Sequence, residues 1–264
     1  MPRFRPLKKF HRLLRRTPNT SSHCPMNTIK GEEIVPQRVR IAIDGPVASG
    51  KSTIGARLAH AVRCLYLDTG VMYRGVTALA LDQGINPTAE ALVTALAARV
   101  QFGFPALDQA TQANPPLLAD GVDITAKLRL PEVDRHVSAV SSYAGVRQAM
   151  VAQQQAIAAS RSVVMVGRDI GTVVLPHAEV KIYLVASAEE RASRRHQERV
   201  AAGIPEDKAQ TLADLQRRDR LDMERVLSPL RPADDAVQLD TTGLDREQVL
   251  ARCLEIIHAR FPEV

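Results

Sequence analysis

Five short apolar runs recur along the chain, separated by longer stretches in which apolar residues follow a helical spacing. The runs are residues 39–44, 65–67, 162–166, 180–185 and 236–240. Short apolar runs between helical segments are typical of strands buried in a parallel sheet. Alternation of such strands with helices predicts an α/β fold, a P-loop NTPase-type parallel sheet of about five strands flanked by helices.

Helical spacing accounts for most of the remaining chain. The expected helices are residues 53–63, one that begins after Gly70 and continues to the stop at Gly84, 88–98, 131–140, 146–160, one that follows Ser187, a second polar one that ends at Val226, and 246–260. Residues 100–124 have a different pattern: a strand-like start, a loop, and a hairpin around Asp120-Gly121. We therefore expect a small antiparallel β insertion at about residues 95–130.

The net charge of +6 is concentrated in the first 25 residues, which hold seven Lys or Arg and no acid. Without these seven charges the rest of the chain carries −1, so a charge-based nucleic-acid signal is confined to the start. We expect residues 1–38 to be a basic, disordered extension and 39–264 to form the folded domain. The extension could be a targeting peptide, a basic arm that binds phosphates, or the product of a wrongly chosen start codon. Met26 favours the last reading.

Composition narrows the class of protein further. Hydrophobic residues make up 45% and charged residues 24%, which are ordinary globular values. No apolar run approaches the ~18 residues of a membrane span. The three cysteines are far apart and form no C-x-x-C pair, which argues against a disulfide framework or a zinc site. These features predict a cytoplasmic protein without a membrane segment.

The first strand runs into the pattern G-x-x-x-x-G-K-[ST], and a helix follows it. A loop of this kind directs backbone N–H groups and a helix N-terminus at phosphate oxygens. Lys51 is expected to reach the β- and γ-phosphates, and the Ser52 hydroxyl is placed to ligate Mg²⁺. The residues expected to bind ATP here are Gly45, Pro46, Val47, Ala48, Ser49, Gly50, Lys51, Ser52 and Thr53.

Arginine dominates the segments that follow the other strands. The residues concerned are Arg74, Arg147, Arg168, Arg191, Arg194, Arg195, Arg217, Arg218, Arg220 and Arg225. A switch GTPase needs a P-loop and one arginine finger, whereas an enzyme that holds two phosphorylated substrates must neutralise both. The number of arginines therefore favours phosphoryl transfer between nucleotides.

Other readings of these features stay open. The arginines at 191–199 lie among glutamates, so a solvated helix face with i,i+4 pairs explains them equally well, and the same explanation is open for those at 217–225. Arg168-Asp169 directly follows an apolar strand, which favours a role in a site. A small P-loop kinase for another monophosphate or a small alcohol is the nearest alternative function. A regulatory NTPase or nucleic-acid-binding ATPase is disfavoured because no aromatic-basic platform is present.

An ordered set of motifs resembles bacterial-type cytidylate kinase from about Val39 to the C-terminal helix. The motifs are Asp44–Pro46 followed by Gly50–Thr53, Asp68–Arg74, Gly121–Thr125, Val137–Ser141, Val146–Arg147, Gly167–Val174, Glu190–Arg195, Arg218–Arg225 and Ser228–Leu230. The P-loop alone is generic, whereas this ordered set is specific.

The resemblance implies roles for individual residues. The residues that match the CMP site are Thr69, Arg74, Ser138, Arg147, Arg168, Asp169, Arg218 and Asp222. Those that match catalytic positions are Lys51, Arg168, Arg218 and Arg225, and Arg191 and Arg195 match the ATP side. Residues 188–226 correspond to a helical lid. One position departs from the family pattern, because Val166 stands where many members have an acid, which puts metal affinity in question.

The resemblance implies a kinase that moves the γ-phosphoryl group of Mg·ATP to CMP or dCMP. Mg²⁺, held with ATP at Ser52, is the expected cofactor. The expected partners are the two nucleotides, with no obligatory protein partner, membrane or nucleic acid, and the expected state is a monomer in the cytoplasm.

Overall fold

The computed structural model describes residues 38–104, 115–201, 203 and 207–261. The chain divides into two units, Met1–Glu32 and Glu33–Val264, and all described residues belong to the second. Of the predicted basic extension, only Arg38 falls within the described residues.

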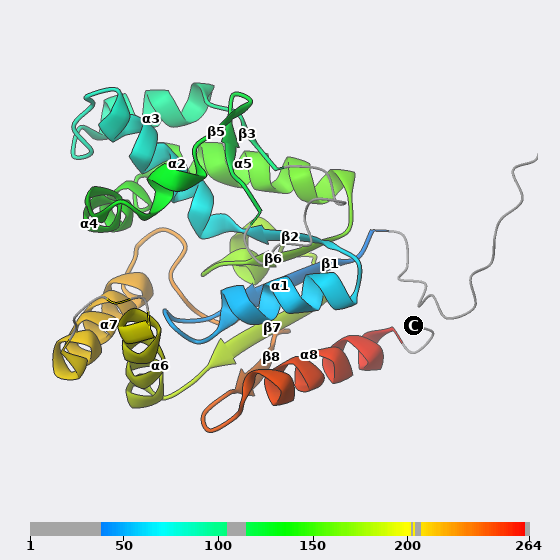
Figure 1. The fold of residues 1–264 in the computed structure, drawn as a ribbon. Coiled ribbons are helices and arrows are strands. Elements are labelled where there is room, and N and C mark those ends of the chain that lie inside the picture. Colours follow the sequence, from blue (N-terminus) through cyan, green and yellow to red (C-terminus); the bar gives the residue numbers. More distant parts are fainter. Residues whose placement is uncertain (1–37, 105–114, 202, 204–206, 262–264) are drawn as a thin grey trace, which may run out of the picture. The chain divides into compact units, whose positions relative to one another are not determined.

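A five-stranded sheet forms the centre of the second unit (Figure 1). In spatial order its strands are β2 (Leu65–Asp68), β6 (Val163–Val166), β1 (Arg40–Asp44), β7 (Val180–Val185) and β8 (Val237–Asp240). All neighbouring strands are parallel. The prediction of a parallel sheet of about five strands is confirmed, and the carboxyl ends of all five lie at one edge.

The central strands are apolar on both sides because helices cover both faces of the sheet. Side chains alternate along β1, so that Ile41 and Ile43 join one core and Ala42 joins the other. The helices on the first face are α1 (Lys51–Ala61) and α8 (Arg246–Arg260), and those on the second include α2 (Thr69–Asp82) and α5 (Ala144–Ser160) (Figure 1).

The antiparallel insertion is also confirmed. It is a three-stranded sheet of β3 (Phe102–Gly103), β4 (Leu118–Ala119) and β5 (Val122–Asp123). Asp120 and Gly121 make the hairpin turn with φ angles of 50° and 84°, a conformation that favours glycine. The neighbouring helices are α3 (Glu90–Arg99), η1 (Thr125–Arg129) and α4 (Pro131–Val140).

Two polar helices follow β7 and pack against each other: α6 (Ala188–Ala201) and α7 (Lys208–Met223). The Ser187 hydroxyl accepts a hydrogen bond from the Glu190 N–H at 3.1 Å, as expected of an N-cap. α7 ends three residues before the predicted Val226. These helices fill most of the segment predicted to be a lid.

Local structure at two strand ends differs from the prediction. α2 begins at Thr69, earlier than expected, because the Asp68 carboxylate accepts the Gly70 N–H and caps the helix. After β6, a π-helical turn, η2 (Ile170–Val174), occupies a segment for which the sequence predicted no helix. The N-terminus of α2 and the backbone N–H groups of η2 therefore lie at the edge of the sheet where the strands end.

Candidate active site

The P-loop joins β1 to α1 and lies against the end of β7. A side chain at Gly45 would place its Cβ 2.1 Å from the carbonyl oxygen of Leu184, so only glycine fits there. Gly50 has a φ of 90° and precedes α1 in a left-handed conformation. The loop therefore turns tightly against the sheet and presents the N-terminus of α1, an arrangement suited to binding phosphate.

Lys51 lies inside this loop and is buried. Its ammonium group donates to the Pro46 carbonyl oxygen and, at 3.2 Å, to the Ser49 hydroxyl. Burial lowers the pKa of Lys51 well below its usual range, and the nearby Arg168 lowers it further. Phosphate oxygens placed beside the ammonium would relieve this desolvation by supplying opposite charge.

Carboxylates end β1 and β2 on either side of β6. Asp44 accepts hydrogen bonds from the N–H groups of Ile170 at 2.8 Å and Gly171 at 2.7 Å. Burial raises the pKa of Asp44 to about 6, although these two bonds oppose the change. Asp68 accepts a hydrogen bond of 2.7 Å from the Ser52 hydroxyl. Asp44 is not among the residues that the sequence predicts for the site, although its position between an apolar strand and Gly45 indicates one.

The Ser52 hydroxyl and the Asp68 carboxylate suit Mg²⁺ chemically, because both are hard oxygen donors. Within the described residues there is no group of three or more His, Cys, Asp or Glu able to hold a metal ion. Mg²⁺ at kinase sites is held by one or two protein groups together with substrate phosphates and water. The residues therefore fit an ion that arrives with ATP.

Asp169 and Arg147, which lie far apart in sequence, form a buried ion pair beyond β6. Arg147 comes from α5, donates to the Ser141 carbonyl oxygen at 3.2 Å and lies 5.6 Å from the centre of the Tyr73 ring. Burial raises the pKa of Asp169, and Arg147 opposes this rise. The paired guanidinium and carboxylate present a donor and an acceptor side by side.

Thr69 lies beside this pair, and Ser138 is linked to it indirectly. The Thr69 hydroxyl donates to the Val166 carbonyl oxygen at 3.0 Å, and a Cβ on Gly167 would be 2.7 Å from that hydroxyl. The Ser138 carbonyl oxygen accepts the Ser141 hydroxyl at 3.0 Å, and Ser141 in turn contacts Arg147. The Thr69 hydroxyl therefore lies at the end of β6, whereas Ser138 is linked to Arg147 through its backbone carbonyl and not through its side chain.

Asp222 joins two of the predicted phosphate-binding arginines. It accepts a hydrogen bond from Arg168 Nε at 3.0 Å, forms an ion pair with Arg225 at 2.5 Å, and is 2% exposed. Burial, followed by the charge of Arg168, lowers the pKa of Arg218 to about 10, and Arg74 and Arg225 contribute to the same effect. Because the charges of the other three arginines lower the pKa of Arg218, the four guanidinium groups lie close enough to interact, and an acceptor phosphate would neutralise them.

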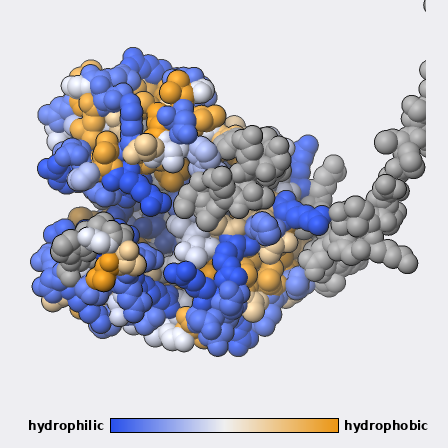
Figure 2. Space-filling model, viewed as in Figure 1, coloured by the Kyte–Doolittle hydropathy of each residue, from blue (hydrophilic) through white to orange (hydrophobic). Residues whose placement is uncertain are grey.

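Arg74 has separate partners at the margin of this cluster. It forms an ion pair with Asp134 at 2.7 Å and donates to the Leu128 carbonyl oxygen at 3.0 Å. On the face seen in Figure 2, hydrophilic residues border a hollow between the region of α4 and the α6–α7 pair.

The two arginines predicted for the ATP side lie in different environments. Arg191 is buried, donates to the Val47 carbonyl oxygen at 3.1 Å and pairs with Asp219 at 2.7 Å. Arg195 pairs with Glu198 on its own helix at 3.6 Å, and its side chain is 43% exposed. The structure therefore brings Arg191, but not Arg195, to the P-loop. Asp219 is not among the predicted site residues either, because no local pattern distinguishes it from its polar neighbours.

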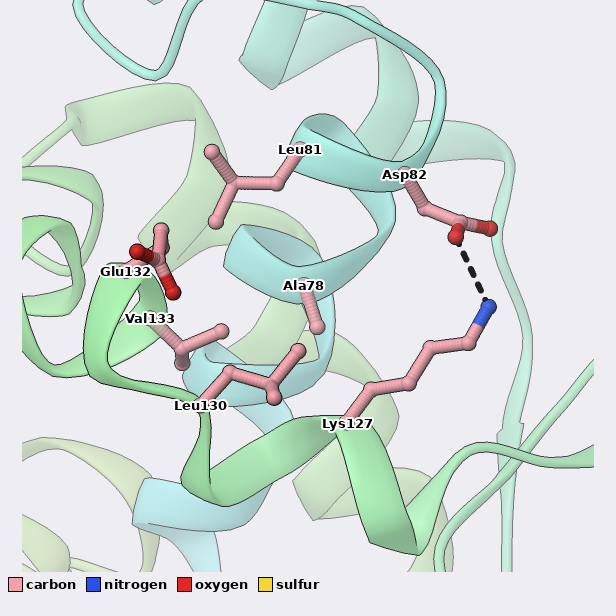
Figure 3. A pocket seen from close by; sticks show the side chains of 7 residues that line it. All are labelled: Ala78, Leu81, Asp82, Lys127, Leu130, Glu132 and Val133. Atoms are coloured by element: carbon pink, nitrogen blue, oxygen red, sulfur yellow. Dashed lines mark ion pairs between the residues drawn. The ribbon is translucent and has the colours of Figure 1, made fainter.

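A separate small pocket of about 210 Å³ lies between α2, η1 and α4 (Figure 3). Its lining residues are Ala78, Leu81, Asp82, Lys127, Leu130, Glu132 and Val133. An ion pair between Lys127 and Asp82 at 2.9 Å borders it. None of the residues predicted for the nucleotide sites lines this pocket.

A P-loop on the central strand of a parallel sheet, with arginines gathered beyond the strand ends, defines the chain as a P-loop kinase. A family model described as Cytidylate kinase matches residues 41–259. The cytidylate kinase of Geobacillus sp. (strain WCH70) is 44% identical over 223 residues, which are 84% of this chain and 98% of that protein. That of Enterococcus faecalis (strain ATCC 700802 / V583) is 48% identical over 220 residues, 83% of this chain and 96% of that protein. This chain belongs to the cytidylate kinase family.

Among solved structures, the shikimate kinase from Acinetobacter baumannii in complex with shikimate has a TM-score of 0.40 and 15% identity, covering 84% of this chain and 93% of that one. Within the described residues, no helix is both long and apolar enough to span a membrane.

Proposed function

We propose that this chain transfers the γ-phosphoryl group of ATP to CMP or dCMP, releasing ADP and the nucleoside diphosphate. Membership of the cytidylate kinase family supports the reaction. The observation that carries the choice of base is the buried pair of Arg147 and Asp169. A carboxylate accepts from the exocyclic amine of cytosine, and a guanidinium donates to the ring carbonyl and nitrogen. Thr69 and Ser138 complete the proposed base site.

The proposed phosphate site uses the arginines around Asp222. Asp222 accepts a hydrogen bond from Arg168 and forms an ion pair with Arg225, which holds both guanidinium groups near the strand ends. An acceptor phosphate entering this cluster would add negative charge beside Arg168, Arg218 and Arg74, whose positive charges outnumber the nearby carboxylates Asp222 and Asp134. Arg225 would bridge the reacting phosphates, and Asp222 would turn to the sugar.

The donor site in this proposal is the P-loop, residues 45–53, with Lys51 directed at the transferring group. Phosphoryl transfer passes through a loose transition state, so catalysis rests on position and charge and requires no base of unusual pKa. Mg²⁺ bound at Ser52 would supply charge neutralisation at the β- and γ-phosphates. Arg191 would hold the P-loop at the ATP site through its hydrogen bond to the Val47 carbonyl oxygen. Arg195 would reach the ATP site only after the lid moves.

The region 188–226 is proposed to act as a lid over a kinase domain that spans 39–264. Closure would exclude water, which otherwise accepts the phosphoryl group. One chain supplies both proposed sites, so we propose that a monomer suffices without an obligatory protein partner. ATP and CMP are cytoplasmic metabolites, and the proposed reaction accordingly takes place in the cytoplasm as part of pyrimidine nucleotide recycling.

A coupled assay of ADP release tests the proposal. The purified protein is given Mg·ATP with CMP, dCMP, UMP, AMP or no acceptor. We expect rapid turnover with CMP or dCMP, little ADP release without acceptor, and loss of activity when Mg²⁺ is chelated. A preference for AMP, or ADP release independent of any acceptor, would contradict the assignment.

A further inference from the structure

Three strands of the central sheet end in an aspartate, and the three carboxylates have different partners. Asp44 at the end of β1 uses both oxygens to accept backbone N–H groups of η2. Asp240 at the end of β8 accepts the Thr242 N–H at 2.9 Å, at the edge of the sheet opposite β2. Only Asp68, at the end of β2, touches the P-loop helix among these three described carboxylates.

Each oxygen of Asp68 has a defined partner. Oδ1 accepts the Gly70 N–H at 2.9 Å and caps α2, which fixes the orientation of the carboxylate. Oδ2 accepts the Ser52 hydroxyl at 2.7 Å. A serine hydroxyl carries one proton and two acceptor lone pairs. Because its proton is directed at Asp68, the lone pairs of Ser52 remain available to a cation on the phosphate side.

The adjacent strand supplies no second carboxylate at this level. Asp68 pairs in register with Val166, which is 1% exposed. The side chain of Val166 packs toward α1, where a Cβ on Gly55 would lie 2.4 Å from Val166 Cγ1. Asp68 also affects its own surroundings, since its charge adds to burial in raising the pKa of Tyr66. Of the carboxylates near the Lys51 ammonium, Asp68 on β2 has the strongest electrostatic effect, followed by Asp44 on β1 and by Asp222.

We propose that Asp68 is the positioning residue for the Mg²⁺ that accompanies ATP: it orients the Ser52 hydroxyl toward the metal and adds negative charge behind it. This inference rests on the proposed function, which requires Mg·ATP at the P-loop. Groups that orient a metal ligand through a hydrogen bond typically change metal affinity by about tenfold to a hundredfold.

The first test is calorimetric binding of ATP in excess Mg²⁺ and in EDTA. In Asp68→Asn the amide oxygen can still cap α2, so the fold is retained while the charge is lost. We expect Asp68→Asn to weaken Mg·ATP binding about tenfold and to leave ATP binding in EDTA unchanged. Asp240→Asn is the matched control, because it changes the same kind of strand-end cap on β8, at the edge of the sheet opposite β2, and both affinities should stay at wild-type values.

A double-mutant cycle tests whether Asp68 acts through the hydroxyl. Ser52→Ala should itself reduce the magnesium-dependent gain in ATP affinity, and adding Asp68→Asn should then reduce it little further. If Asp68→Asn does not fold, Asp68→Ser replaces it in both binding experiments, because serine can also cap the helix.

The outcomes separate this inference from the proposed function. A wild-type protein that binds no ATP contradicts the proposed function itself. A wild-type gain from Mg²⁺ that persists in full in Asp68→Asn overturns the role of Asp68 alone. Equal losses from Asp68→Asn in the presence and absence of Ser52 would overturn its action through the hydroxyl.

Discussion

The guanidinium of Arg191 on α6 forms an ion pair of 2.7 Å with Asp219 on α7 and, through the same nitrogen, donates to the Val47 carbonyl oxygen at 3.1 Å. Both side chains are at most 10% exposed. One guanidinium therefore joins two helices of the proposed lid and the phosphate-binding loop. This arrangement gives Arg191 a structural role in addition to its proposed place on the ATP side.

We predict that Asp219→Ala destabilises the protein and weakens ATP binding. Removing one partner of a buried pair leaves the other charge without compensation and typically costs about 3–5 kcal/mol. Urea unfolding measures the free energy of unfolding, and calorimetry measures ATP affinity. Asp214→Ala on the same helix is the matched control. Its pair with Arg217, at 2.9 Å, is exposed, so its removal should cost less than about 1 kcal/mol. Similar losses in the two variants would contradict the prediction.

We predict that Lys51→Ala reduces kcat by at least about a hundredfold without unfolding the protein. Loss of one preorganised charge at the transferring group costs on the order of 3 kcal/mol. The fold should tolerate the change because burial already disfavours the ammonium, as its lowered pKa indicates. Steady-state kinetics and thermal unfolding test the two parts. Lys127→Ala removes an ammonium whose partner is Asp82 outside the loop, and it should leave kcat near the wild-type value.

The raised pKa of Asp44 predicts a pH dependence of stability. Burial raises this pKa from an ordinary 3.8 to about 6, so the folded chain binds the proton more tightly than the unfolded chain. The contribution of Asp44 to the free energy of unfolding is therefore fully present below the unfolded pKa and is lost as the pH rises through about 6. A shift of this size corresponds to about 3 kcal/mol.

Urea unfolding of the wild type and Asp44→Asn between about pH 4 and pH 7 measures this effect. The wild-type advantage over the variant should decline as the pH rises. Asp240→Asn is the control. The Thr242 hydroxyl and N–H lower the pKa of Asp240 from 3.8, so its contribution is present above the unfolded pKa, is lost only as the pH falls below it, and should stay nearly constant over this range. A difference between wild type and Asp44→Asn that does not change with pH would contradict the assignment.

Much of the fold follows from local pattern. The apolar runs of β1, β6 and β7 exceed what a solvated strand carries, and the Asp-Gly turn marks the hairpin of the insertion. Strand order and side-chain pairing are not local properties, because they depend on which helices cover each face. The sequence accordingly predicted five strands without the spatial order β2-β6-β1-β7-β8.

The same difference between local pattern and long-range packing applies to the candidate site. The P-loop and the Arg168-Asp169 pair are contiguous motifs, and spacing alone located them. The partner of Arg191 is different, since Asp219 lies 28 positions away on a helix rich in charges, and only helix packing selects it. Arg195 is predicted for the ATP side, but it forms an i,i+3 pair with Glu198 on its own helix. This pair fits the alternative that the arginines of this helix form a solvated face.

Base recognition provides the most specific test of the proposed function. Uracil replaces the exocyclic amine of cytosine with a carbonyl oxygen, so the Asp169 carboxylate would face a second acceptor. An unpaired buried polar group costs about 1–3 kcal/mol, and more when it is charged. The amide of Asp169→Asn can donate to that oxygen. We predict that this variant lowers kcat/KM for CMP at least about tenfold and narrows the ratio of CMP to UMP activity.

Because Asp169 is paired with the buried Arg147, the ratio of kcat/KM for CMP to kcat/KM for UMP is more informative than the rate with CMP alone. Asp169→Asn also removes the charge that Arg147 pairs with, so part of any lost activity reflects a misplaced guanidinium and affects both acceptors. Arg168→Ala is the matched control. Arg168 contacts Asp222 in the proposed phosphate cluster, and its loss should lower both activities alike and preserve the ratio. An Asn variant with reduced activity and the wild-type ratio would show that Asp169 positions Arg147 but does not read the base.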